Sequence, residues 1–150
     1  MSGLLGGWDW FDNALQNVLK ETGYRPLNKS QSMMILYISA GVHRPAEIAR
    51  NMRLSRQAIR YIEKQLVAMG MITSIVDPKD RRSKALVFSE EAKEIREAAR
   101  ATIFSLEAIL AERIGVANVA ALRAVLDLDW GPIIRGGRDF EQLARTGSGE

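Results

Sequence analysis

The sequence predicts a mainly α-helical protein with one small β-hairpin. Apolar residues recur at helical spacing along most of the 150 residues, whereas two short runs typical of strands, the β-branched run at 72–76 and an apolar run at 85–88, lie in the middle of the chain. The chain is 47% hydrophobic and 26% charged, as is usual for a globular protein, and its length suits one domain over residues 1–150. We therefore expect one folded domain and no extensive disorder.

Six helices are expected from the apolar spacing and from residues that begin or end helices. Asn28 with Gln31 forms a capping-box pattern, Pro45 suits a first helical position, and Ser55, Ser89 and Asn118 suit N-caps. The expected helices cover residues 9–21, 29–40, 45–52, 56–69, 90–114 and 119–130. Residues 1–6 are expected to be mobile, and residues 136–150, which contain four glycines, to form a flexible tail.

The central helices and the hairpin together form a pattern typical of DNA-binding proteins. The short helix at 45–52, a tight turn and the helix at 56–69 make a helix-turn-helix, whose second helix is the recognition helix. The hairpin follows this helix directly, with residues 77–84 expected as a charged loop between its strands. The sequence therefore predicts a winged helix-turn-helix lobe over residues 27–89, with the hairpin as the wing.

The charge distribution supports this interpretation. The net charge of the chain is only +3, but residues 43–84 contain ten basic and four acidic side chains, a local charge of +6, so the rest carries −3. A basic segment between acidic flanks is typical of a nucleic-acid-binding unit.

Arginine and glutamine side chains can read base edges, whereas lysine and tyrosine commonly contact phosphates. The candidate DNA-binding residues of the recognition helix are Ser55, Arg56, Gln57, Arg60, Tyr61 and Lys64. Those of the wing are Lys79, Asp80, Arg81, Arg82 and Lys84, where an arginine suits the minor groove and Asp80 could hold an arginine in position. The alternatives are a solvated basic helix face and a polar hairpin tip; for a single helix the first is commoner, but the attached wing favours DNA reading.

Four segments carry a resemblance to a known family: 54–60, 66–70, the 77–82 stretch D-P-K-D-R-R, and 87–89. They resemble the MarR (multiple antibiotic resistance regulator) family of bacterial transcription factors over about residues 27–93. The resemblance implies a homodimer that binds pseudo-palindromic double-stranded DNA and usually represses, with Arg82 entering the minor groove and Asp80 supporting it. Two residues depart from the family pattern: Arg44 replaces a small capping residue before Pro45, and Ala58 replaces a serine or threonine.

The resemblance also implies that the first and the last two helices, residues 8–23 and 90–135, form the dimer interface. Their apolar stripes are more than one small lobe can bury. The candidate interface residues are Phe11, Leu15, Leu106, Ile109, Leu122, Leu126 and Trp130.

Many members of the family bind a small aromatic acid between the dimer interface and the DNA-binding lobe. The candidate pocket residues here are Trp8, Phe11, Tyr24, Tyr37 and His43. The favoured alternative is that the aromatic residues belong to the dimer core and that His43 is a loop residue or phosphate contact, since aromatic residues at helical spacing mostly pack in cores.

Several function classes are excluded or disfavoured. The chain has no cysteine, which removes disulfides, thiol sensing and cysteine nucleophiles, and one histidine, so no metal site and no cofactor is expected. No paired acid–base or nucleophile spacing indicates an enzyme. The longest apolar run, residues 33–38, cannot span a membrane, and the first basic residue is Lys20, so a cytoplasmic protein without secretory signal is expected. The alternative function is a winged-helix module that binds proteins and has no DNA target.

Overall fold

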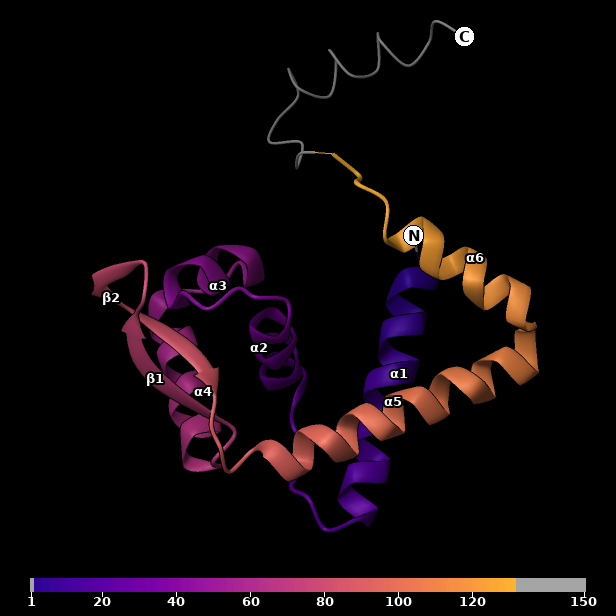
Figure 1. Ribbon diagram of the computed structural model, residues 1–150, viewed down its shortest axis with the longest axis horizontal. Coiled ribbons are helices and arrows are strands. Elements are labelled where there is room, and N and C mark those ends of the chain that lie inside the picture. The colour runs from indigo at the N-terminus through magenta and orange to yellow at the C-terminus, as the bar shows by residue number, and fades with distance from the viewer. Residues whose placement is uncertain (1, 132–150) are drawn as a thin grey trace, which may run out of the picture. The chain divides into compact units, whose positions relative to one another are not determined.

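The computed structural model describes residues 2–131 of the chain (Figure 1). Within this range six helices and one two-stranded antiparallel sheet follow one another in the predicted order. The elements are α1 (Ser2–Glu21), α2 (Lys29–Ser39), α3 (Pro45–Met52), α4 (Arg56–Ala68), β1 (Ile72–Asp77), β2 (Asp80–Phe88), α5 (Lys93–Ile114) and α6 (Val116–Leu126). By packing, the chain divides into two compact units, Met1–Leu110 and Ala111–Glu150, which are described separately.

The local signals that begin α2, α3 and α4 are confirmed. At α2, the Asn28 side chain accepts the backbone N–H of Gln31 at 3.0 Å, and Gln31 Oε1 accepts the N–H of Asn28 at 2.9 Å. Helix α3 begins at Pro45, and the Ser55 hydroxyl accepts the N–H of Ala58 at 3.1 Å at the start of α4. These bonds satisfy N–H groups that have no partner inside a helix, so they fix where each helix begins.

The core of the first unit lies between α2, α3, α4 and the base of the hairpin. The predicted apolar stripes of these helices converge there, and Ile59, Ile62 and Leu66 of α4 are all buried. The large side chains with almost no exposure are Met34, Ile38, Ile48, Ile59, Leu66, Ile72 and Leu86. A hydrogen bond of 3.0 Å from Gln31 Nε2 to Gln65 Oε1 adds a polar link between α2 and α4. The inner face of α4 is therefore held, and its outer face is left for other contacts.

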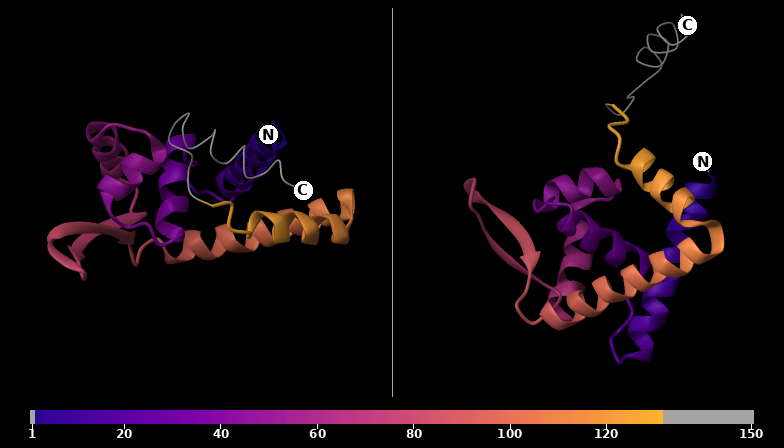
Figure 2. Two further views of the ribbon diagram at one scale, coloured as in Figure 1. Left: turned by 90° about the horizontal axis from the view of Figure 1, so that it is seen from above. Right: turned by 45° about the vertical axis from the view of Figure 1, so that its right-hand side comes forward.

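The hairpin differs from the prediction. The expected loop over residues 77–84 is wrong, because β2 begins at Asp80 and only Pro78 and Lys79 connect the strands. Residues 81–84 thus belong to a strand, although they are all polar. A two-stranded hairpin that projects from the helices (Figure 2) has solvent on much of both faces, so its strands can carry charged side chains that resemble a loop in the sequence.

The strand register has one irregularity near the tip. Val76 is paired with Lys84, whereas the next residue, Asp77, is paired with Asp80. Three residues of β2, 81–83, therefore lie opposite no residue of β1, which is a large bulge.

Three helix boundaries also differ from expectation. Helix α1 already begins at Ser2, where residues 1–6 were expected to be mobile; its glycines lower helix propensity without blocking the backbone hydrogen bonds. Helix α5 begins at Lys93, because Ser89 accepts the Ala92 N–H in a turn before the helix and does not cap it at residue 90. Helix α6 spans 116–126 and not 119–130, since Gly115 precedes it and Asn118 donates to the Ile114 carbonyl at 2.6 Å.

The outer helices bury little of their apolar surface. In α6 no residue is buried, and α1 and α5 each contribute one buried residue, Leu19 and Leu106. None of the helices in residues 2–131 combines the length and apolar character that a membrane span requires. The expected tail over residues 136–150 lies outside the described residues.

Candidate DNA interface

The outer face of α4 carries the polar side chains that were predicted to read DNA. Ser55, Arg56, Gln57, Arg60, Tyr61 and Lys64 are all exposed, and Tyr61 keeps 65% of its surface in contact with solvent. A shallow hollow of about 630 Å³ lies on this face, lined by Ser55, Gln57, Ala58, Arg60, Tyr61 and Lys64. Because Ile59, Ile62 and Leu66 are anchored in the core, the opposite residues of the same helix are held outward.

A second hollow, of about 560 Å³, joins this face to the wing. Its lining residues are Arg44, Pro45, Ala46, Arg56, Ile59, Arg60, Glu63, Lys64, Ser83 and Lys84. The structure thus brings Lys84 of the wing to the same concave surface as Arg56, Arg60 and Lys64 of the recognition helix. Five basic side chains and one acidic side chain surround it, and a concave surface lined by one sign of charge attracts the opposite sign.

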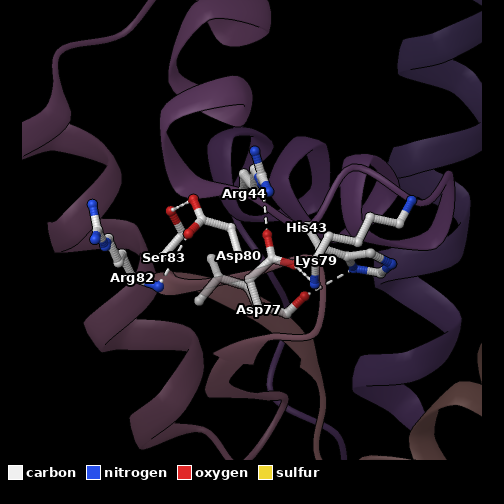
Figure 3. A network of polar contacts seen from close by, with 8 residues as sticks. His43, Arg44, Asp77, Lys79, Asp80, Arg82 and Ser83 are labelled. Atoms are coloured by element: carbon white, nitrogen blue, oxygen red, sulfur yellow. Dashed lines mark hydrogen bonds and ion pairs between the residues drawn. The ribbon is translucent and has the colours of Figure 1, made fainter.

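Asp80 fixes the backbone around the wing arginines (Figure 3). Its Oδ1 accepts the backbone N–H of Arg82 at 3.1 Å, and its Oδ2 accepts the Ser83 hydroxyl at 2.7 Å. The Ser83 hydroxyl, followed by the Arg82 N–H, lowers the pKa of Asp80. Asp80 was expected to hold an arginine side chain; among its described contacts, it holds the main chain of Arg82, whose guanidinium points away from this cluster.

An ion pair that no sequence pattern predicts lies at the edge of this surface. Arg44 Nε donates to Asp77 Oδ2 at 2.5 Å, and Asp77 Oδ1 accepts the N–H of Lys79 at 2.8 Å. The Lys79 N–H and then the Arg44 bond lower the pKa of Asp77, and the Asp77 carboxylate raises the pKa of Arg44. In the sequence Arg44 stands out only as a departure from the family pattern, and no local pattern connects two residues 33 positions apart.

Solved structures with the same architecture exist, although no protein-family model matches the sequence and no curated protein matches it significantly. A MarR-family transcriptional regulator from Rhodococcus sp. RHA1 is 24% identical, with a TM-score of 0.57 over 83% of this chain and 86% of that chain. CouR from Rhodococcus jostii RHA1, bound to p-coumaroyl-CoA, is 23% identical, with a TM-score of 0.59 over 89% and 92%. A MepR variant from S. aureus, bound to an oligodeoxyribonucleotide, is 16% identical, with a TM-score of 0.54 over 83% and 91%.

This chain has the fold of the MarR-family regulators. The predicted fold class, a mainly helical winged helix-turn-helix with helices on both sides, is thereby confirmed. In the MarR fold of this chain, the face formed by α4 and the wing is the candidate DNA interface.

The five residues predicted to line a ligand pocket are not brought together around either hollow of this MarR fold. Trp8, Phe11, Tyr24 and Tyr37 are half-buried, and the Phe11 ring packs edge-on against Trp10 at 4.9 Å between centroids. His43 lies in the loop before α3, with Nδ1 3.0 Å from the Leu86 carbonyl. The aromatic pocket stays a prediction.

The residues predicted for the dimer interface differ in how exposed they are in the single chain. Leu106 is already buried within the chain, and Phe11 and Leu15 are half-buried. Exposed are Ile109 in the first unit and, in the second unit, Leu122, Leu126 and Trp130. Within residues 2–131, no group of three histidine or acidic side chains is placed to hold a metal ion.

Proposed function

We propose that this chain is a MarR-family transcriptional repressor that binds double-stranded DNA in the cytoplasm, as a homodimer on a pseudo-palindromic operator. The observation that carries the proposal is the continuous basic surface over α4 and the wing, where Arg56, Arg60, Lys64 and Lys84 surround one hollow. Basic side chains around a groove suit a phosphate backbone, while Gln57 and Arg56 at the start of α4 suit base edges. MepR, a similar structure, is bound to an oligodeoxyribonucleotide, which supports the same role here.

Helix α4 and the wing would each contact a different groove of the DNA. The first turn of α4 would enter the major groove, where arginine pairs with guanine and glutamine with adenine. The exposed Arg82 of the wing would lie in the adjacent minor groove, whose negative potential attracts arginine.

The homodimer in this proposal is supported by the exposed apolar residues of α6. Val116, Leu122, Val125 and Leu126 are each at least 45% exposed in the single chain, and α6 has no buried residue. A helix that is apolar and exposed needs a partner surface, and a second copy related by a two-fold axis supplies one. Two recognition helices then read half-sites about one DNA turn, roughly 10 base pairs, apart.

Release by a small aromatic ligand completes the proposal. CouR, another similar structure, is bound to p-coumaroyl-CoA, and the half-buried aromatic residues Trp8, Phe11 and Tyr37 of α1 and α2 would supply ring surface for an aromatic ligand. The effector would lower the affinity for the operator, which a ligand screen on the recovered protein–DNA complex measures.

The test is selection of bound duplexes from random DNA, followed by light scattering of the free protein. We expect a two-fold symmetric sequence, a dimer at micromolar concentration, and a changed preference within the half-site for Arg56→Ala and Gln57→Ala. Arg100→Ala, which removes an exposed arginine of α5, is the matched control and should leave the selected sequence unchanged. Failure to recover any salt-sensitive specific sequence would refute DNA reading, and binding of a protein partner after nuclease treatment would favour the protein-interaction alternative.

A further inference from the structure

The wing is attached to the loop before α3 at two places. Near the base of the hairpin, the Leu86 N–H donates to the His43 carbonyl at 2.8 Å, and the His43 ring lies 3.0 Å from the Leu86 carbonyl. Near the tip, Arg44 Nε donates to Asp77 Oδ2 at 2.5 Å (Figure 3). Adjacent residues of one loop thus hold both ends of the hairpin.

Asp77 carries a negative charge in a place where it opposes DNA binding. It is 5% exposed, although it lies in the most basic segment of the chain and beside the surface proposed to bind phosphates. A carboxylate there repels DNA, so electrostatics alone favours any other residue. In the free protein this carboxylate accepts two hydrogen bonds, one from Arg44 and one from the Lys79 N–H, so its charge holds the loop before α3 to the hairpin.

Asp77 is connected to the wing arginine through its strand partner, Asp80. Asp77 is paired with Asp80 across the two-residue turn, and Asp80 holds the Arg82 N–H and the Ser83 hydroxyl. Arg82 itself lies in the bulge between Asp80 and Lys84, where no ladder partner fixes its position. A shift of Asp77 would therefore move the backbone that carries Arg82.

We propose that the Arg44–Asp77 ion pair is a brace that fixes the wing against α3 and so sets the position of Arg82 relative to the recognition helix. Arg44 and Asp77 are positioning residues for DNA binding, and the negative charge of Asp77 strengthens binding although it faces a polyanion. The inference rests on the proposed function, because it assigns these residues a role in DNA recognition.

The direction in which one substitution changes the DNA affinity distinguishes the brace from simple electrostatic repulsion. Asp77→Asn removes one negative charge and keeps an oxygen that can accept the Lys79 N–H. Electrostatics alone predicts tighter binding, whereas the brace predicts binding weaker by about fivefold or more, comparable to loss of one arginine contact. Glu90→Gln is the matched control, since it removes an exposed acid outside the interface and should not weaken binding.

A second measurement asks whether Arg44 acts through the wing. Affinities for the selected duplex are compared for wild type, Arg44→Gln, Arg82→Ala and the double variant, with thermal melting of each to confirm folding. If Arg44 positions Arg82, the loss caused by Arg44→Gln becomes clearly smaller once Arg82 is absent. Arg44 is half exposed, so this cycle remains informative if Asp77→Asn does not fold.

The outcomes are distinct. Unchanged or tighter binding by folded Asp77→Asn overturns the brace, and so do fully additive losses in the Arg44–Arg82 cycle, which would make Arg44 a direct phosphate contact. Absence of any specific DNA complex with the wild-type protein would instead overturn the proposed function. Weaker binding by Asp77→Asn together with a non-additive cycle supports the brace.

Discussion

Lys64→Gln should make DNA binding less sensitive to salt by an amount that the structure sets. Lys64 is exposed and lines both hollows of the candidate interface, so it is placed to neutralise one phosphate in each protomer. Each neutralised phosphate contributes about −0.9 to the slope of log affinity against log salt concentration, so two per dimer contribute about −1.8. The four cations per protomer around the second hollow, leaving out the paired Arg44, together contribute up to about −7 to the wild-type slope.

The assay is fluorescence anisotropy of the selected duplex over a series of potassium chloride concentrations. Between about 50 and about 200 mM, a slope difference of about 1.8 means that the variant loses about twelvefold less affinity than the wild type. Lys20→Gln is the matched control, because Lys20 is an exposed lysine at the end of α1, outside both hollows. Equal slopes for wild type and Lys64→Gln would refute the placement of Lys64 on phosphate, and a difference near 0.9 would mean that one protomer contacts the DNA.

Three further predictions concern assembly and stability. Leu122→Glu places a charge on the exposed apolar α6, so light scattering should find monomers at micromolar concentration; a persisting dimer would contradict an interface through this helix. Leu66→Ala should lower the free energy of unfolding by about 2–5 kcal/mol in denaturant titrations, because Leu66 is fully buried, whereas Val67→Ala at a 46% exposed neighbour should change it by less than about 0.5 kcal/mol. The pKa values of Asp77 and Asp80 lie below their ordinary value of 3.8, so their charged forms stabilise the fold above that pH and lose this effect as pH falls through the lower folded-state values. In denaturant titrations, replacing both by asparagine should therefore destabilise the protein most at neutral pH and progressively less below about pH 4, and a constant difference would contradict this.

The elements that could be predicted well are those whose signals are local. Pro45 and Ser55 lie within one turn of the helices that they begin, and both α3 and α4 begin at the expected residue. The outward-facing residues of α4 could also be predicted, because the buried positions of Ile59 and Leu66 determine which residues of this helix face outward.

The wing could not be predicted to the same extent because its structure depends on pairing between residues. Residues 81–84 are polar, as in a loop, and become a strand only because β1 lies beside them. The brace depends on Asp77 meeting Arg44, which the fold brings together from distant parts of the chain. The predicted bounds of α6 were wrong because of one side chain. Asn118 donates to a carbonyl of the preceding helix, and the sequence pattern does not distinguish this bond from N-capping.

The hydrogen bond between Gln31 and Gln65 has a consequence for how accurately bases can be read. Gln65 lies nine residues after Arg56 on α4, which is about 14 Å along the helix axis. A rotation of only about 2° around Gln65 would therefore displace Arg56 by about 0.5 Å, the tolerance within which a recognition side chain must be held. A small rotation of α4 near Gln65 thus becomes a large displacement at its first turn. Small changes in packing near Gln31 or Leu66 should therefore alter the sequence preference of Arg56 and Gln57, although neither Gln31 nor Leu66 contacts a base.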